Sequence, residues 1–189
     1  MSDVARFVMI MDTRRCIGCH SCTVACKVNN ELPIDMIYNP VFTHGPNGVF
    51  PHVSMTFYPH LCMHCENPPC VGCCPSGASQ QDGDGIVWVD QNKCIGCKAC
   101  IQACPYRARH ANASTGTVQK CDFCKERARE GLEPFCVQTC HQRARIFGDL
   151  NDPESAVSQM VNSMHTLQLL PDIGTDPHVY YIIPPGGQV

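Results

Sequence analysis

Sixteen of the 17 cysteines fall into four groups whose spacing suits metal binding through thiolates. Two of the groups share the spacing C-x2-C-x2-C-x3-C: Cys16, Cys19, Cys22 and Cys26, and then Cys94, Cys97, Cys100 and Cys104. With this spacing a short loop surrounds a 4Fe–4S cluster with three thiolates, while the fourth thiolate ligates a second cluster. Two such runs in one chain predict iron–sulfur chemistry.

The other two groups have wider spacing but the same final C-x3-C step. They are Cys62, Cys65, Cys70 and Cys74, and then Cys121, Cys124, Cys136 and Cys140. Alone, the last group would suit a tetrahedral zinc site. Cys73 is the one cysteine outside the pattern, because Cys74 keeps the C-x3-C-Pro spacing; we expect Cys73 to be a small buried residue.

Other local interpretations stay open. Cys16 to His20 matches the C-x-x-C-H haem motif. His20, His64 and His141 each adjoin a group cysteine and could ligate iron as in a Rieske centre. A set of disulfides is a weaker alternative, because 17 is an odd number and C-x2-C spacing is poor for joining separate loops.

The four groups form an internal repeat. All four cysteines of the first group recur 78 positions later in the third, each time in a Cys-Ile-Gly-Cys loop after a basic residue. Pro68-Pro69-Cys70-Val71 is echoed by Pro134-Phe135-Cys136-Val137. The order is therefore a duplicated two-motif unit.

The charge distribution fits this chemistry. With 14 Lys and Arg against 17 Asp and Glu, the net charge of −3 offers no basic surface for nucleic acid. Four clusters with their thiolates would add about −8, and 13 of the 14 basic residues lie in or near a cysteine group. The group containing Cys62, Cys65 and Cys70 has no Lys or Arg nearby in sequence. Our hypothesis is that its cluster receives the least positive charge and has a low potential.

Short apolar stretches should position the cysteine loops. Strands are predicted over 4–12, 53–58, 86–89, 115–119 and 145–148, and a short helix over 24–31. Residues 32–53 carry Pro, Gly and aromatic residues without periodicity. Strand, cysteine loop and short helix in repetition predict an α+β, ferredoxin-like fold.

The C-terminal part, after the last cysteine group, contains no cysteine. Asp152 as N-cap and Pro153 at the first position predict a helix to about 165. Residues 166–189 contain no basic residue and an apolar run at 179–183. We expect this tail to lie on a partner, with packing on its own domain as the alternative. We expect no membrane span and no signal peptide of its own, since no apolar run approaches the ~20 residues that a spanning helix needs.

These residues together resemble one family. The stretch Cys62 to Cys70 (CMHCENPPC), Cys100 to Arg107 (CIQACPYR) and Phe147 to Pro153 (FGDLNDP) are similar to the four-cluster iron–sulfur subunits of molybdopterin oxidoreductases of the dimethyl sulfoxide reductase superfamily. The strongest similarity is to the electron-transfer subunits of polysulfide, thiosulfate, tetrathionate and arsenate reductases. Two departures are His141, where Pro is common, and Cys73, where the family has an apolar residue.

The resemblance implies two ferredoxin-like domains, one inserted in the other, with long loops and a C-terminal extension. The outer domain would comprise 1–52 and 112–150, the inserted domain 53–111, and the helix and apolar tail 151–189. It also implies four 4Fe–4S clusters with crossed ligation: Cys16, Cys19, Cys22 and Cys140; Cys121, Cys124, Cys136 and Cys26; Cys62, Cys65, Cys70 and Cys104; Cys94, Cys97, Cys100 and Cys74. The sequence shows no catalytic constellation of its own.

The implied function is electron relay to or from a large molybdenum or tungsten bis-pterin subunit, which would hold the molybdopterin and the catalysis. The complex would be a respiratory reductase of a sulfur or arsenic compound, with a membrane-anchor or quinone-linked subunit as a further candidate partner. It would be periplasmic after export with a partner, or cytoplasmic. The alternatives are the same subunit in a formate dehydrogenase-type or transhydroxylase-type complex, and a free-standing polyferredoxin.

Overall fold

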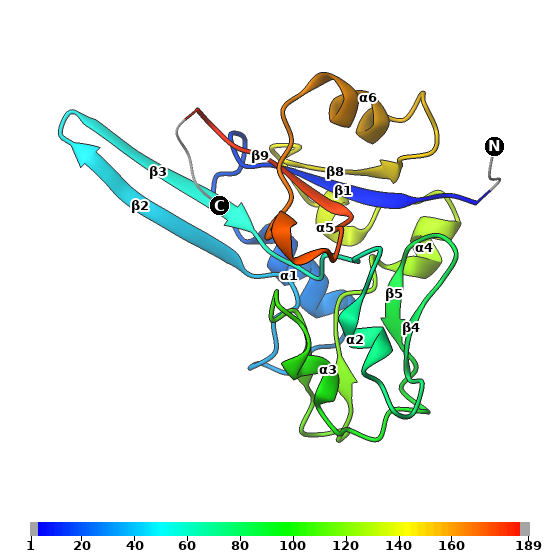
Figure 1. The fold of residues 1–189 in the computed structure, drawn as a ribbon. Coiled ribbons are helices and arrows are strands. Elements are labelled where there is room, and N and C mark those ends of the chain that lie inside the picture. The colour runs from blue at the N-terminus through cyan, green and yellow to red at the C-terminus, as the bar shows by residue number, and fades with distance from the viewer. Residues whose placement is uncertain (1–3, 186–189) are drawn as a thin grey trace.

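A three-stranded sheet forms the upper part of the molecule (Figure 1). This computed structural model describes residues 4–185. The central strand β1 (Phe7–Asp12) pairs antiparallel with β8 (Arg145–Asp149) and parallel with β9 (Val179–Ile182). Val8 and Ile10 pack on one side with Val157 of helix α6 (Ala156–Ser163), whereas Met9 and Met11 belong to the core that contains the cysteines. The alternation of side chains along β1 therefore separates a conventional core from the cysteine-rich one.

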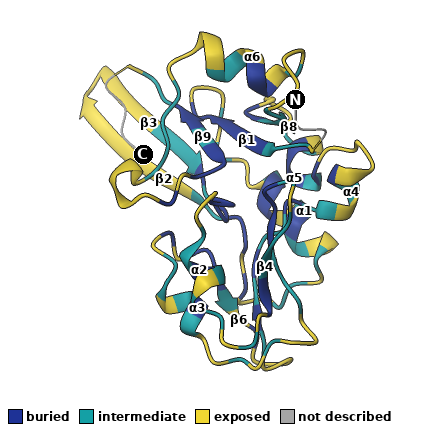
Figure 2. Ribbon diagram, turned by 45° about the vertical axis from the view of Figure 1, so that its right-hand side comes forward, coloured by how far each residue is buried: buried dark blue, intermediate teal, exposed yellow. Residues whose placement is uncertain are grey.

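A long hairpin extends from this body (Figures 1 and 2). It joins β2 (Val41–Val49) to β3 (His52–Pro59), and its tip carries Val49 and Phe50, which are 81% and 87% exposed. The sequence predicted β3 but not β2. The outer hairpin is exposed on both faces, so β2 lacks the alternation of apolar and polar residues that marks a half-buried strand.

Short elements surround the remaining cysteines. The two small sheets are β4 (Ser79–Gln81) with β5 (Val87–Val89) and β6 (His110–Ala111) with β7 (Val118–Gln119). The helices that carry or follow the cysteines are α1 (Ser21–Asn29), α2 (Pro69–Gly72), α3 (Ala99–Gln102), α4 (Lys125–Arg129) and α5 (Phe135–Gln138). A 3-10 helix covers Pro171–Ile173. The architecture is a mixed α and β fold with small sheets, as an α+β prediction requires.

Two helix starts differ from the prediction. Helix α1 begins at Ser21 instead of residue 24, directly after His20, whose φ is 60°. Helix α6 begins at Ala156, because Ser155 is its N-cap and its hydroxyl accepts the backbone N–H of Ser158 at 3.1 Å. The Asp152 carboxylate instead accepts the N–H of Glu154 at 2.9 Å, in a turn before the helix.

The C-terminal segment packs on its own chain. The strand expected at 179–183 forms as β9 and lies against the central strand, where Tyr181 and Val179 are fully buried. Its apolar residues are thus part of the protein's own core, which was the alternative to a partner contact. Residues 186–189, the end of the predicted tail, lie outside the described part. Between residues 4 and 185 no helix has the length and apolar character needed to span a bilayer.

Candidate metal centres

The fold brings the sixteen group cysteines into four sets of four. Set one surrounds a hollow between the first cysteine loop and the end of the fourth group, and consists of Cys16, Cys19, Cys22 and Cys140. Set two surrounds a second hollow and consists of Cys26, Cys121, Cys124 and Cys136. The fourth cysteines of the first and fourth groups have therefore exchanged places, as the ferredoxin pattern allows.

The two middle groups exchange their fourth cysteines in the same way. Set four lines a hollow and consists of Cys74, Cys94, Cys97 and Cys100. In set three, the thiol of Cys65 interacts with three others, and the set consists of Cys62, Cys65, Cys70 and Cys104. The hollows of sets one, two and four are alike in size, and each has four cysteines among its lining residues.

Sets one, two and four each surround a hollow. Within residues 4–185, no three His, Cys, Asp or Glu side chains converge closely enough to hold a single metal ion. Four cysteines line each hollow, joined by His20 at set one and Asp122 at set two, and four cysteines are the donor set of a 4Fe–4S cluster. The residues present therefore fit such clusters.

Glycines allow close approach at the two repeated loops. Gly18 and Gly96 both have φ of +67°, a conformation that favours glycine. A Cβ on Gly18 would lie 2.5 Å from the ring of Phe57 on the hairpin, and one on Gly96 would lie 2.1 Å from the carbonyl oxygen of Gly116. The hairpin therefore covers the loop of set one, whereas backbone covers the loop of set four.

Burial raises the pKa of the inner thiols, so they ionise less readily. It raises the pKa of Cys26 and of Cys65 to about 12 and that of Cys124 to about 11, with neighbouring thiolates adding to the effect at Cys26 and Cys65. The pKa of Cys121 is also raised well above its ordinary value, mainly by burial. Thiolates in these positions need a cation, and iron bound by the thiolates would supply it while releasing protons.

Several of the less buried thiols accept hydrogen bonds from the protein. Backbone N–H groups of Ser79, Val118 and Ala144 donate to the sulfurs of Cys74, Cys94 and Cys140 at 3.4, 3.4 and 3.2 Å. The hydroxyl of Ser21 lowers the pKa of exposed Cys19. Such N–H···S contacts raise the potential of a cluster, since they stabilise the added electron.

Set three has buried cations beside it although no Lys or Arg is near it in the sequence, and the low potential stays a prediction. Arg109, which follows the third group, donates to the sulfur of Cys70 at 2.9 Å in a buried contact. Lys120, also buried, adds its charge near Cys70 and donates to the carbonyl oxygens of Val87 and Cys121. Both cations come from other parts of the sequence, so counting neighbours along the chain could not find them.

The three candidate histidines occupy different environments. His20 and His141 are exposed. His64 is completely buried, and its Nδ1 accepts the N–H of Val87 at 3.1 Å. Burial lowers its pKa well below the ordinary value, so the ring is neutral.

Residues 175–178 of the C-terminal segment pack against the cysteine loop of set three, a contact that the sequence did not predict. Backbone N–H groups of Glu66 and Asn67 donate to Asp176 and Thr175 at 2.8 and 3.1 Å, and His178 donates to Met63 at 2.8 Å. The hydroxyls of Thr175 and Tyr106 lie 2.5 Å apart in a buried contact that also holds this segment. No spacing rule connects segments about a hundred residues apart, and only the tertiary fold reveals the contact.

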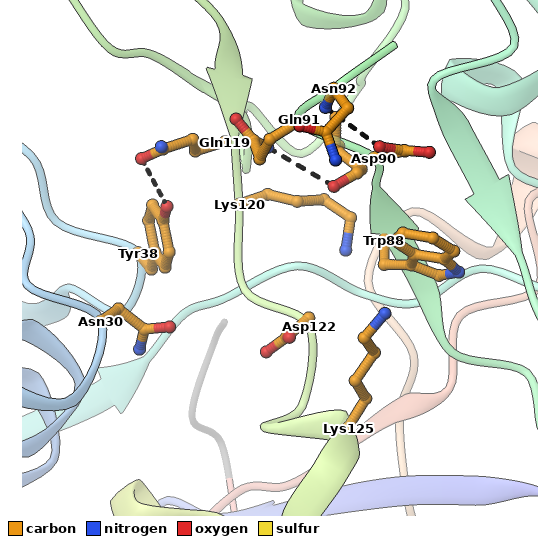
Figure 3. Close-up of a pocket in the computed structure, with 11 residues that line it drawn as sticks. Asn30, Tyr38, Trp88, Asp90, Gln91, Asn92, Gln119, Lys120, Asp122 and Lys125 are labelled. Atoms are coloured by element: carbon orange, nitrogen blue, oxygen red, sulfur yellow. Dashed lines mark hydrogen bonds between the residues drawn. The ribbon is translucent and has the colours of Figure 1, made fainter. Parts of the chain in front are cut away.

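A polar cleft is lined by residues from several parts of the chain (Figure 3). Tyr38 donates to Gln119 at 3.0 Å on one side, and on the other the ammonium group of Lys125 lies 3.5 Å from the centre of the Trp88 ring. No cysteine lines it. It carries no set of donors comparable to those around the hollows.

Comparison with known proteins agrees with this geometry. Residues 53–150 match the model of a 4Fe–4S dicluster domain. The chain is 44% identical to a subunit of the tetrathionate reductase of Salmonella typhimurium, covering 94% of this chain and 72% of that one. It is 40% identical to a subunit of the selenate reductase of Mesobacillus selenatarsenatis, with coverage of 94% and 72%. It is 35% identical to the arsenate respiratory reductase iron–sulfur subunit of Shewanella sp. strain ANA-3, with coverage of 94% and 96%.

These relatives are named as subunits of reductases, and their likeness extends over nearly all of this chain. The cofactors are 4Fe–4S clusters, and the role is non-catalytic electron transfer. The catalytic site and its molybdopterin belong to a partner subunit. The chain belongs to the family of 4Fe–4S dicluster iron–sulfur subunits of respiratory molybdopterin-type reductases.

Proposed function

We propose that the protein carries four 4Fe–4S clusters, one in each cysteine set, and relays single electrons between a molybdenum or tungsten bis-pterin subunit and an outside donor or acceptor. The observation that carries the proposal is the gathering of sixteen cysteines into four sets, three of them around hollows of similar volume. When bound, the clusters supply reversible one-electron chemistry. The chain supplies their thiolates and sets their environment.

The arrangement supports a definite order along the relay. Sets one and two share the first and fourth groups, and sets three and four share the second and third. Sets two and three meet where His64, between two cysteines of set three, stacks on Phe123, between two cysteines of set two. The order would be one, two, three, four, with the sets that contain exposed Cys19 and Cys97 at the ends.

The two ferredoxin-like domains, the second inserted in the first, follow from the same exchange. The outer domain would hold sets one and two and the inserted domain sets three and four, with boundaries at 1–52 plus 112–150 and 53–111. The crossed cysteines support this division, since each exchange stays within one pair of groups. Helix α6 and β9 would then extend the outer domain.

For the complex we propose a respiratory reductase of a sulfur or arsenic compound. Support comes from the relatives, whose names include tetrathionate and arsenate reductases. A membrane-anchor or quinone-linked subunit would be a second partner. The compartment would be the periplasm after export with a partner, with the cytoplasm as the alternative; fractionation of cells with antibody to this chain decides between them.

Metal analysis and copurification test the proposal. Anaerobically purified protein should contain about sixteen iron and sixteen sulfide per chain and show EPR signals from reduced 4Fe–4S clusters. Affinity capture from the native host should recover a large molybdopterin-binding subunit, and its substrate follows from activity assays of that complex. About eight iron, or zinc without sulfide, would contradict four clusters. A fully loaded monomer that never associates with a larger subunit would favour a free-standing polyferredoxin.

A further inference from the structure

The internal repeat extends beyond the cysteines into a pair of arginines. Cys104 is followed by Pro-Tyr-Arg-Ala-Arg and Cys140 by His-Gln-Arg-Ala-Arg. In both copies the first arginine, Arg107 or Arg143, is exposed and has positive φ, 52° and 49°. In both copies the second arginine, Arg109 or Arg145, is buried, with 4% and 2% of its surface exposed.

Arg109 lies between sets three and four. One of its terminal nitrogens donates to the sulfur of Cys70 in set three at 2.9 Å and to the hydroxyl of Ser79 at 2.6 Å. The same side chain lines the hollow of set four, and it also interacts with the thiol of Cys100. Its other terminal nitrogen, Nη1, is buried without a hydrogen-bond partner in the described structure.

Arg145 has the equivalent place between sets one and two. It lines the hollow of set one, yet the thiol that interacts most strongly with its charge is that of Cys136, in set two. The guanidinium is anchored by Asn39, whose side-chain oxygen accepts at 2.5 Å. The third cysteine of an extended group is therefore the main thiol neighbour in both copies.

Neither buried arginine has a carboxylate as counter-ion. Across residues 4–185, no Asp or Glu oxygen lies within 4.0 Å of either guanidinium. A buried charge without a partner is costly, so the structure must compensate it elsewhere. The negative charge on each side is that of the cysteine sulfurs. A fixed cation there favours the cluster state with one more electron, since attraction is strong where water is excluded.

We propose that Arg109 and Arg145 are two matched potential-setting cations, each acting on both clusters of one pair: Arg109 on those of sets three and four, and Arg145 on those of sets one and two. The inference rests on the proposed four-cluster function. Arginine suits this position because its charge persists at all physiological pH values and its planar fork holds two acceptors at once.

The test is a potentiometric titration of the cluster-loaded chain, followed by EPR. Arg109→Gln should lower the midpoint potentials of the clusters in sets three and four. At a fixed potential, their ratio of reduced to oxidised cluster should fall at least about tenfold, which is about 59 mV for one electron. Arg145→Gln should shift the other pair instead. Arg107→Gln and Arg143→Gln are matched controls. Each removes the same charge from an exposed arginine that lies two residues before the buried one.

Arg109→Lys and Arg145→Lys separate charge from shape. Potentials close to wild type in the lysine variants support the proposal, and they keep it testable should a glutamine variant lose iron. Equal shifts in all four clusters, no shift in fully loaded glutamine variants, or lysine variants that shift as far as glutamine would overturn it. The proposed function fails separately, if the unaltered chain does not hold about sixteen iron.

Discussion

The ring of His64 stacks on the ring of Phe123, with centroids 3.6 Å apart and an interplanar angle of 18°. Each ring lies between two cysteines of a C-x2-C step, one in set three and the other in set two. Both side chains are buried, and Phe123 also meets the edge of Phe147 on β8. The stack therefore joins the two cysteine pairs to each other and to the central sheet.

Phe123→Ala should destabilise the protein strongly. Phe123 is 1% exposed, and truncating a buried Phe leaves a cavity that costs about 3–5 kcal/mol. Phe50→Ala is the control, since it removes the same atoms from a side chain that is 87% exposed and should cost less than about 0.5 kcal/mol. Urea unfolding followed by circular dichroism measures both. Equal loss in the two variants would show that the stack contributes nothing.

The positions of the cysteines were largely readable from sequence, because ligand spacing is a local property of a loop. The repeat of Cys16 at Cys94 and the C-x3-C steps predicted where the metal-binding loops lie. Non-local features were not readable. Arg109 donates to Cys70, which lies 39 positions earlier, and Thr175 of the C-terminal segment contacts Cys65 of set three. No local sequence pattern predicts either contact.

The fold was predictable in the same uneven way. Strands β1, β5 and β8 carry apolar runs and β3 alternates apolar with polar residues, and the sequence located all four within a few residues. β2 was missed because it does not alternate apolar with polar residues, and the start of α6 was misplaced because both Asp152 and Ser155 are good caps. Only the distance between Ser155 and the N–H of Ser158 shows which residue caps the helix.

Cys73 and Cys74 should respond oppositely to replacement. Cys74 lines the hollow of set four, whereas the sulfur of Cys73, which is half-buried, is 3.7 Å from the carbonyl oxygen of Cys70 and does not line that hollow. Cys73→Ala should keep about sixteen iron per chain, and Cys74→Ala should lose iron from one cluster. Iron analysis with EPR distinguishes them. Loss of iron in the Cys73 variant alone would exchange the two roles.

Gly96→Ala should be much more harmful than Gly131→Ala. Both glycines have positive φ, 67° and 75°, so both variants share a backbone cost of about 1–2 kcal/mol. Only at Gly96 would the new Cβ meet backbone, the oxygen of Gly116 at 2.1 Å, which adds about 1–3 kcal/mol of overpacking. Thermal unfolding and iron content measure the difference. Matching losses would mean that the loop of set four moves aside without cost.

His178 should make the protein sensitive to mild acid. The ring is fully buried, and burial lowers its pKa below 6.5, helped by the charge of Arg6 and opposed by Glu66 and Asp176. Below pH 6.5 His178 therefore takes up a proton in the unfolded chain more readily than in the folded chain. Because the unfolded state binds more protons, the free energy of unfolding decreases as pH falls and is unaffected by this residue well above pH 6.5.

His178→Gln should make that decrease shallower. The amide can still meet Arg6 or Glu66, which lie 3.2 and 2.9 Å from the ring nitrogen Nε2, but it cannot take up a proton. Between pH 6.5 and 5.5 the slope of unfolding free energy against pH should decrease by up to about 1.4 kcal/mol per pH unit. Urea unfolding of cluster-loaded protein at a series of pH values measures it. Above pH 7.5 the two profiles should run parallel, since the ring is then neutral in both states, and an unchanged slope below pH 6.5 would show that His178 takes its proton in the folded protein.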